Sequence, residues 1–339
     1  MRAYEIGDQT GLASLTATTR PDPVPGPGEV VVKVRAICLN HRDLNVLAGA
    51  YGPRRPHDRI PMSDGIGEVL ALGAGVTGLA VGDRVTTPHF ITWTDGAFSP
   101  TAFAADLGIT RDGWLAEQLL VPATTLVKVP DSLGDAQVAP LAAAGLTAWN
   151  ALVVFGRIKA GDRVLVLGTG GVSILALQIA RMLGASVAVT SSSDAKLAMA
   201  RDLGADITIN YRSTPDWSSA LLAETGGAGA DIIIETGGFG TLAQSITAAA
   251  VNGRIAIIGA LAGAAGEGLP NYGSIIGKNL TLHGIAAGSR AMLADLVRAI
   301  AANGVHPVIN RSFGFDEAPA AYSWLKSGDH FGKVMITLP

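Results

Sequence analysis

The chain has 339 residues, 48% of them hydrophobic and 16% charged, which predicts two folded domains with sizeable buried cores rather than a disordered chain. Its formal net charge is −3, and its 25 Lys and Arg residues are scattered along the sequence, which disfavours a nucleic-acid partner. Cys38 is the only cysteine, so the sequence offers neither an intrachain disulfide nor a cysteine cluster for a metal.

The start of the chain and its apolar stretches predict a cytoplasmic protein with no membrane partner. Residues 1–5 (MRAYE) lack the apolar core of a secretory signal. The longest apolar stretch, residues 139–156, is interrupted by Pro140, Thr147 and Asn150. We therefore expect no membrane-spanning helix.

The first part of the chain is predicted to be rich in β-strands. Residues 30–36 (VVVKVRA) and 65–72 (GIGEVLAL) are apolar runs bounded by Gly, Pro and Asp, as strands commonly are, and residues 83–85 continue the pattern. The proline-rich residues 21–28 predict a surface connection.

The middle of the chain alternates between short apolar runs and helical stretches. This rhythm predicts right-handed βαβ units in a parallel sheet with both faces covered. The expected strands are residues 164–167, 187–189, 207–209, 231–234 and 255–258, with 280–283 as a possible sheet edge, and the expected helices are residues 171–183, 194–203 and 242–250. The tail is expected to hold helices over 292–303 and 317–326 and a last strand over 334–338.

A glycine-rich turn lies between the first of these strands and the first of these helices. It consists of Gly168, Thr169, Gly170, Gly171, Val172 and Ser173. A strand–turn–helix context of this kind is typical of dinucleotide binding, because the second glycine lets the backbone approach a pyrophosphate at a helix N-terminus. The alternative is a turn without a ligand. We favour the dinucleotide, since strand–helix units repeat around the turn.

The second strand of the unit ends in hydroxyl side chains, where an enzyme that prefers NAD usually carries an acid. Ser191 and Ser192 occupy this place, and Lys196 follows within one helical turn. Hydroxyl donors and a positive charge suit a 2′-phosphate, which favours NADP(H) over NAD(H). The alternative makes Ser193 or Asp194 a helix N-cap and Lys196 a solvated side chain.

The order of motifs resembles the medium-chain dehydrogenase/reductase superfamily over nearly the whole chain. The resemblance rests on NHRD (40–43), SDGIGEVLALGAGVTGLAVGDRV (63–85), GWLAEQLLVP (113–122), AAGLTA (143–148), the glycine turn, GAD (204–206), NY (210–211) and FGKV (331–334). It implies an α/β protein with a Rossmann doubly wound parallel sheet over residues 126–289. A β-rich GroES-like catalytic domain over 1–125 would be completed by about 290–339.

The zinc enzymes of this superfamily place a Cys and a His on a catalytic zinc. In this chain the matching positions carry Asn40 and Ser63, with Asp64 after the latter, and no thiol lies near the third ligand position at Ala144. Catalytic zinc needs three protein ligands and an open position, so we expect no metal. Cys38 then remains as a buried apolar filler.

The chain looks closer to the zinc-free quinone oxidoreductase and enoyl reductase branch. In that branch the stretch matching Asn40 to Asn45, ending at residues 49–51 (GAY), forms an active-site strand and loop. The tyrosine matching Tyr51 lies near the nicotinamide, and the asparagine matching Asn40 lines the pocket. The positions matching Lys196 and Tyr211 reach the adenosine phosphate. Four further positions match residues near the cofactor: Gly259, Gly288, Phe331 and Lys333.

The resemblance suggests hydride transfer from NADPH to a quinone or an α,β-unsaturated carbonyl compound. Without a metal, a conjugated acceptor is easier to reduce than a simple ketone, since the charge spreads over an enolate. Tyr51 would act as general acid and Asn40 would orient the substrate, although Tyr51 could merely pack in its loop and Asn40 could merely hold backbone. Arg42 and Asp43 are expected to form a structural pair. The six histidines show no paired ligand spacing and receive no catalytic role.

Two alternatives stay open at this point. The chain could be a metal-free NADP-dependent alcohol dehydrogenase acting on activated alcohols, or a catalytically silent NADPH-binding protein. Family dimers pair through strands like residues 280–283, so we expect a homodimer. Residues 90–110 and 261–272 look like variable loops that shape the pocket.

Overall fold

The structure is a computed structural model in which residues 1–259 and 271–339 are described. The chain forms two compact units. Unit 1 comprises Met1–Leu146 and Gly288–Pro339, and unit 2 comprises Thr147–Ala287. The C-terminal segment therefore belongs to the same unit as the N-terminal segment. The expected loop over residues 261–272 falls almost wholly outside the described residues.

Unit 1 is built around a seven-stranded sheet in which β14, β15, β3, β4, β5 and β7 are neighbours in that order and β6 also pairs with β3. A two-stranded sheet, β1 and β2, accompanies it. The strands are β1 (Arg2–Glu5), β2 (Thr16–Thr19), β3 (Glu29–Cys38), β4 (Asp64–Leu72), β5 (Arg84–Thr86), β6 (Gln118–Pro122), β7 (Val127–Lys128), β14 (Ile309–Gly314) and β15 (Lys333–Thr337).

Strand β3 holds this sheet together, since it pairs with β4, β6 and β15. Val32, Val34 and Ala36 are buried, whereas Lys33 and Arg35 between them are exposed. Alternation of this kind places the β-branched residues on the core face of the pleated strand. Cys38, the last residue of β3, is buried as expected, and burial raises the pKa of its thiol to about 12.

Four helices accompany the sheet of unit 1 among the described residues. They are α1 (His41–Leu47), α2 (Asp135–Val138), α9 (Arg290–Asn303) and α10 (Ala318–Ser327), with 3₁₀ turns at Leu12–Ser14, Pro100–Ala105, Ala123–Thr125 and Phe315–Glu317. The sequence predicts a strand and loop from Asn40 onward, and this prediction is wrong. Helix α1 begins directly after Asn40 instead. The carboxylate of Asp43 accepts the backbone N–H of Asn40 at 2.7 Å, which is one half of a capping box.

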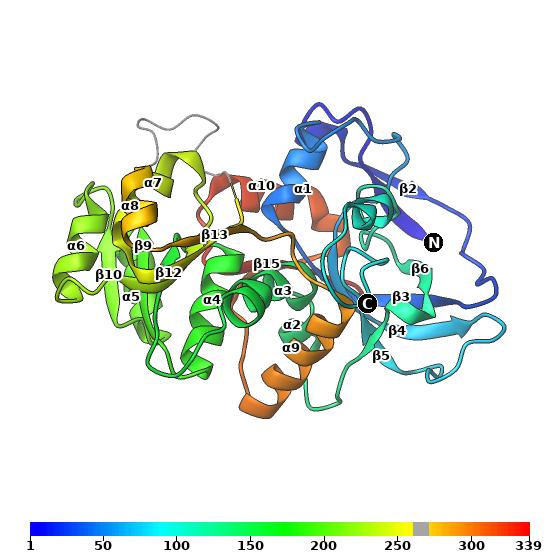
Figure 1. Ribbon diagram of the computed structural model, residues 1–339. Helices are drawn as coiled ribbons and strands as arrows, with labels where there is room; N and C mark the ends of the chain where they lie inside the picture. The colour runs from blue at the N-terminus through cyan, green and yellow to red at the C-terminus, as the bar shows by residue number, and fades with distance from the viewer. Residues whose placement is uncertain (260–270) are drawn as a thin grey trace. The chain divides into compact units, whose positions relative to one another are not determined.

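Unit 2 contains a six-stranded parallel sheet with the order β10-β9-β8-β11-β12-β13 (Figure 1). This is the doubly wound order, in which successive strands are added on one side of β8 and then, from β11 onward, on its other side. The Rossmann prediction is confirmed. The strands are β8 (Arg163–Leu167), β9 (Ser186–Ser191), β10 (Ile207–Asn210), β11 (Ala230–Glu235), β12 (Ala249–Ile257) and β13 (Thr281–Gly284).

Helices α4 (Gly171–Met182), α5 (Asp194–Asp202), α6 (Trp217–Glu224), α7 (Phe239–Ala248) and α8 (Tyr272–Gly277) connect these strands (Figure 1). The interior strands are continuous apolar runs, such as the buried Ile232, Ile233 and Ile234 of β11. Runs of this type are expected where a parallel sheet is covered on both faces.

A helical run over Asp135–Phe155 is longer and more apolar than we expect from the sequence. Its polar interruptions at Pro140, Thr147 and Asn150 do not end it. By length and composition alone it could cross a membrane, but 83% of its most apolar window is buried inside the protein. It is therefore a core helix. It includes π-helical turns at Leu141–Gly145 and Asn150–Phe155 and the short α3 (Leu146–Trp149).

Candidate functional site

The glycine turn of unit 2 lies at the carboxyl end of β8, at the point where the strand order reverses. Gly168 has φ +75°, a left-handed conformation that favours glycine. Gly170 is the N-cap residue of α4 and has no side chain with which to cap the helix. The free N–H groups of the first turn of α4 are thus available to an anion.

Two hydroxyl groups hold this turn against the sheet. Both Ser173 Oγ and Thr236 Oγ1 donate to the carbonyl oxygen of Leu167, at 2.6 and 2.9 Å. Ser173 is buried, so a serine is accommodated at the third small position of the motif. The turn is therefore rigidly attached to the ends of β8 and β11.

The space beside the turn fits a dinucleotide. A Cβ atom built on Gly168 or Gly170 meets no heavy atom within 4 Å, so the space beside these backbone positions is open. A pyrophosphate can approach the backbone there as it does in Rossmann sites. Thr169, Gly171 and Val172 complete the predicted turn.

The predicted adenosine side lies at the carboxyl end of β9. Ser191 is buried, and its carbonyl oxygen accepts the backbone N–H of Tyr211 at 3.0 Å. Ser193 caps α5 by accepting the N–H of Lys196, which confirms the capping alternative for Ser193. Asp194 accepts a hydrogen bond from Asn210 at 2.8 Å. The structure thus brings Ser191, Ser193, Lys196 and Tyr211 to one edge of the sheet.

The remaining predicted cofactor residues are divided between the two units. Gly259 belongs to unit 2, and a Cβ atom there would lie 2.6 Å from the carbonyl oxygen of Thr236. Gly288, Phe331 and Lys333 belong to unit 1. Gly288 is closely packed, since a Cβ atom would lie 2.7 Å from the side chain of Leu146. Phe331 is buried.

A buried polar network in unit 1 joins two of the predicted site residues. Lys333 Nζ donates to Asn40 Oδ1 at 2.7 Å and to Asp64 Oδ2 at 2.9 Å. Asn40 Nδ2 donates to Asp64 Oδ2 at 2.9 Å, and the N–H of Ala143 donates to Asp64 Oδ1. The orientation of the Asn40 amide follows from its partners, because lysine only donates and an ionised carboxylate only accepts.

Asp43 lies beside this network and is also buried. Burial raises the pKa of its carboxyl group to about 6, and this rise is opposed by Arg42, by the hydrogen bond from Asn40 and by Lys333. A carboxyl group with such a pKa changes its charge in the neutral to mildly acidic range.

Arg42 does not form the ion pair with Asp43 that we expect from the sequence. Its guanidinium instead donates to Asp106 Oδ1 at 2.7 Å and lies 2.8 Å from Nδ1 of His89. Asp106 comes from a different segment, 64 residues further along the chain, so no local pattern could have identified it. The predicted pair of Arg42 and Asp43 is therefore wrong.

His89 is buried rather than at the surface. Its Nδ1 atom lies 2.9 Å from Asp106 Oδ1. Burial and then Arg42 lower the pKa of His89, whereas Asp106 opposes the shift. Burial alone would raise the pKa of Asp106, but His89 and Arg42 together hold it low. The group therefore contains an ionised Asp106, a neutral His89 and the charged Arg42.

Tyr51 contacts the group formed by Arg42, His89 and Asp106 rather than the Asn40 network. The guanidinium of Arg42 lies 5.3 Å from the centre of the Tyr51 ring, within the range of a cation–π contact. The ring of His89 packs on Phe90 with 4.0 Å between ring centres, and Phe98 and Phe103 extend this aromatic group outward. The predicted catalytic residues thus lie in two neighbouring clusters of unit 1.

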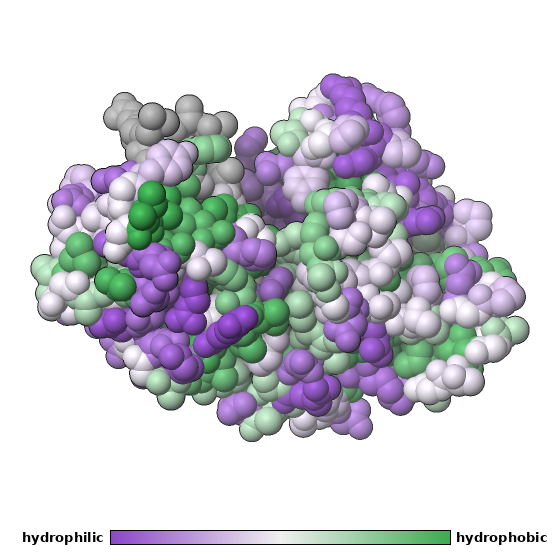
Figure 2. All heavy atoms as spheres, viewed as in Figure 1, coloured by the Kyte–Doolittle hydropathy of each residue, from purple (hydrophilic) through white to green (hydrophobic). Residues whose placement is uncertain are grey.

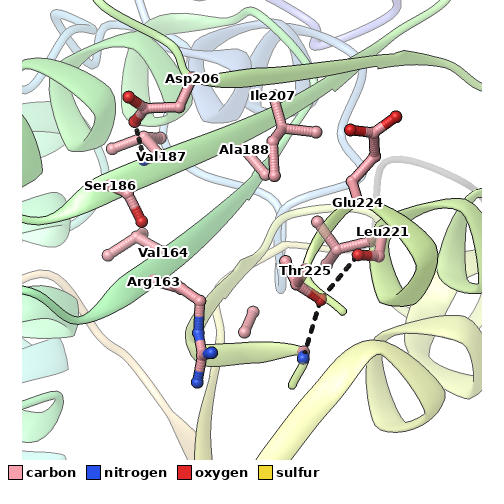
Figure 3. Close-up of a pocket in the computed structure, with 12 residues that line it drawn as sticks. Arg163, Val164, Ser186, Val187, Ala188, Asp206, Ile207, Leu221, Glu224 and Thr225 are labelled. Atoms are coloured by element: carbon pink, nitrogen blue, oxygen red, sulfur yellow. Dashed lines mark hydrogen bonds between the residues drawn. The ribbon is translucent and has the colours of Figure 1, made fainter. Parts of the chain in front are cut away.

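A pocket of about 250 Å³ opens at the opposite edge of the parallel sheet (Figure 3). Arg163, Ser186, Ile207 and Ala230, the first residues of β8 to β11, line it. Several of its polar groups are bonded within the protein. Arg163 pairs with Asp231. Asp206 accepts the N–H of Val187, while Thr225 donates to the carbonyl oxygen of Leu221 and accepts the N–H of Gly229 (Figure 3). Ligands of doubly wound sheets bind at the carboxyl ends of the strands, so we assign no role to this pocket.

Comparisons with known proteins match both parts of the chain. Residues 171–302 match the family model described as zinc-binding dehydrogenase, and residues 26–131 match the alcohol dehydrogenase GroES-like domain. The zinc-type alcohol dehydrogenase-like protein C1773.06c of Schizosaccharomyces pombe is 44% identical over 323 residues, which is 92% of this chain and 91% of the relative. The GroES-like part of the fold prediction is thereby confirmed.

Two other similar proteins differ in what their names state. The acryloyl-coenzyme A reductase of Metallosphaera sedula is 30% identical over 93% of this chain and 94% of its own length. A crystal structure of an NAD-dependent alcohol dehydrogenase is 33% identical, with a TM-score of 0.90 and full coverage of both chains. Similar chains thus include both an NAD-dependent alcohol dehydrogenase and an acryloyl-coenzyme A reductase.

Proposed function

Because the chain belongs to the medium-chain dehydrogenase/reductase superfamily, we propose that it is a zinc-independent, NADPH-dependent reductase of quinones or α,β-unsaturated carbonyl compounds. The observation that carries the nucleotide part is the open glycine turn, Gly168 to Gly171, before the uncapped helix α4. The similarity to acryloyl-coenzyme A reductase supports a conjugated acceptor.

In this proposal the turn holds the pyrophosphate of the cofactor by backbone N–H groups of α4. When bound, the reduced nicotinamide supplies a hydride. Ser191, Ser192 and Lys196 hold the 2′-phosphate, with Tyr211 beside the adenosine. Gly259, Gly288 and Phe331 border the cofactor.

Preference for NADPH is supported by the residues at the end of β9. The segment carries hydroxyl groups and Lys196, whereas the exposed Asp194 is engaged by Asn210. A carboxylate placed on the ribose would repel a phosphate, but hydroxyls and a lysine attract it. The similar NAD-dependent alcohol dehydrogenase makes NAD the competing cofactor. The test compares the catalytic efficiency with NADPH and with NADH, in the wild type and in a Lys196→Ala variant. A preference for NADPH that falls in the variant supports the proposal.

Tyr51 is proposed to move the proton that completes the reduction. Its phenol can donate a hydrogen bond to the carbonyl oxygen of the acceptor and then a proton. Arg42 holds the ring from one side, and the ion pair of Arg42 with the buried Asp106 fixes the guanidinium. Asn40 helps to orient the substrate in this proposal. Its amide binds Asp64 and Lys333 with one N–H and one lone pair, and the other N–H and lone pair can bind the substrate.

The test is a substrate panel with the purified protein. We expect NADPH oxidation with quinones and enones, and little NADP⁺ reduction with benzylic or allylic alcohols. The reverse pattern would establish an alcohol dehydrogenase, the activity named for the alcohol dehydrogenase-like relative from Schizosaccharomyces pombe. Tight NADPH binding without turnover of any acceptor would instead indicate a silent nucleotide-binding protein. The proposal includes a cytoplasmic location and a homodimer.

A further inference from the structure

Asp194 is the one acidic side chain that the sequence offers near the adenosine side of the proposed nucleotide site. It is the only Asp or Glu between Gly168 and Arg201, and it is the first residue of α5, shortly after the end of β9. An acid at this end of the second strand binds the ribose hydroxyls of NAD, and it would repel a 2′-phosphate. The exposed carboxylate of Asp194 therefore opposes a preference for NADPH unless another group restrains it.

The side chain of Asn210 binds this carboxylate. Asn210 is the last residue of β10, and the pairing of β10 with β9 places it beside Ser191. Its Nδ2 donates to Asp194 Oδ1 at 2.8 Å, and its Oδ1 accepts the backbone N–H of Arg212 at 3.0 Å. The bond from Arg212 identifies the oxygen of the amide, so the end that only donates is the one directed at Asp194.

Asn210 is itself held in place by the turn that follows β10. Its carbonyl oxygen accepts the backbone N–H of Thr214 at 2.8 Å and the hydroxyl of Ser213 at 3.2 Å. The next N–H along the chain, that of Tyr211, donates to the carbonyl oxygen of Ser191 at 3.0 Å. A donor that is already ordered in this way loses little further conformational entropy when it binds a carboxylate. Asn210 can therefore keep the side chain of Asp194 at the end of β10.

We propose that Asn210 determines the cofactor specificity of the nucleotide site by restraining Asp194. The hydrogen bond keeps the carboxylate away from Ser191 and Ser192, where the 2′ group of the cofactor binds in the proposed function. A released carboxylate can turn toward that group. It then repels a 2′-phosphate and accepts a hydrogen bond from a free ribose hydroxyl. The inference rests on the proposed preference for NADPH, but it does not depend on which acceptor the enzyme reduces.

Titration of the purified protein with NADPH and with NADH, followed by cofactor fluorescence, tests the inference without any acceptor. The quantity compared is the Kd for NADH divided by the Kd for NADPH. Asn210→Ala should lower this ratio about tenfold, because a carboxylate within a few ångström then faces a phosphate that carries about two negative charges. In an Asp194→Ala background the same replacement should leave the ratio unchanged, since no carboxylate remains to be released.

The comparison of the two backgrounds separates specificity from local structure. Asn210→Ala also removes the acceptor for the N–H of Arg212, but this loss is the same in both backgrounds and cancels. If Asn210→Ala does not fold, Asn210→Ser takes its place. The serine hydroxyl can still accept the N–H of Arg212 in a turn of the same kind, but it is shorter than the amide and does not reach Asp194.

Gln244→Ala is the matched control, because the amide of Gln244 also accepts a backbone N–H, from Ser218, and donates to an oxygen, that of Pro215. It should keep the wild-type ratio.

An unchanged or increased ratio in Asn210→Ala would overturn the inference, as would an equal fall in both backgrounds. A wild-type protein that binds NADH more tightly than NADPH would contradict the proposed cofactor preference instead. The two backgrounds decide the role of Asn210 in that case too, because they measure a change in the ratio and not the ratio itself.

Discussion

At the scale of single residues, the two clusters of unit 1 place charged groups in the interior and give each of them a partner. Arg42 is paired with Asp106, and Lys333 is paired with Asp64. Removal of one member of such a pair leaves an uncompensated buried charge, which is strongly destabilising. Functional variants in this region therefore have to preserve charge balance. Tyr51 is the exception, since its contact with Arg42 is made by the ring face.

Replacement of Tyr51 by Phe removes only the phenolic hydroxyl. The Phe ring can keep its contact with Arg42, so we expect a folded protein with unchanged NADPH affinity. If the hydroxyl delivers the proton, kcat should fall about 100-fold, the usual contribution of a general acid. The measurement is steady-state turnover together with NADPH titration by fluorescence. Unchanged turnover would remove Tyr51 from the mechanism.

Asp43 should make the stability of the protein depend on pH. Its pKa of about 6 in the folded protein lies above the ordinary aspartate value of 3.8. The folded state therefore favours the protonated form, and this contribution to stability is complete below about pH 4 and is lost as the pH rises through about 6. A difference of about two pKa units corresponds to about 3 kcal/mol.

Asp43→Asn removes this titration while keeping an acceptor for the N–H of Asn40. From pH 4 to pH 7, the free energy of unfolding of the wild type should fall relative to that of Asp43→Asn by about 3 kcal/mol. Urea unfolding at several pH values measures this difference. Asp131→Asn, which removes an exposed carboxylate of unit 1, serves as control. If both variants differ from wild type by the same amount at every pH, the expectation is wrong.

Sequence reasoning at this scale reached local partners but not distant ones. Asn40 and Asp43 have the spacing of a helix start, and that signal could have predicted α1 where the family resemblance led to a loop. By contrast, the contacts of Asp106 with Arg42 and of Lys333 with Asn40 join residues that are 64 and 293 positions apart in the chain. These contacts depend on strand order and not on any pattern in the neighbouring residues.

At the scale of elements, the turn from β8 to α4 contains two glycines that differ in backbone conformation. Gly168 has φ +75°, whereas Gly170 has φ −79° and ψ −174°, a conformation open to any residue. Neither has a heavy atom within 4 Å of a built Cβ. The fold alone therefore does not require a glycine at position 170. We attribute it to the approach of a pyrophosphate.

The two glycines should consequently respond differently to alanine. Gly168→Ala should lower stability by about 1–2 kcal/mol, because an L residue is strained at this φ. Gly170→Ala should leave the melting temperature unchanged and weaken NADPH binding about tenfold or more, a loss of at least about 1.4 kcal/mol. Thermal melting and NADPH titration of both variants distinguish the effects. Full NADPH affinity in Gly170→Ala would place the cofactor elsewhere.

The parallel sheet of unit 2 was predictable because each element carries its own signal. Short apolar runs mark β8, β9 and β11, and glycine or serine marks the start of the following helix. Strand β14 (Ile309–Gly314) was missed, since its sequence INRSFG has neither an apolar run nor a regular alternation. It forms by parallel pairing with β15. Here tertiary pairing, and not local propensity, decides the structure.

At the scale of the whole molecule, β13 is one of the two terminal strands of the unit 2 sheet, and no further strand pairs with its outer edge among the described residues. Strand β13 is the last strand in the order, and Thr281, His283 and Gly284 on it are exposed. An uncovered edge presents backbone donors and acceptors to another strand. Hydrophobic side chains gather on the neighbouring helix α8 (Figure 2), where Ile276 is 80% exposed. Both features favour pairing with a second copy of the chain.

A lysine on this edge should therefore weaken the predicted homodimer. In a two-fold arrangement Thr281→Lys places two positive charges near the paired β13 strands, and charged edge residues oppose such pairing. We expect the dimer dissociation constant to rise about tenfold or more, equivalent to at least about 1.4 kcal/mol. Thr16→Lys, on the exposed face of β2 in unit 1, controls for added charge. Sedimentation over a range of concentrations measures the effect, and a dimer equally stable in both variants would show that β13 does not form the interface.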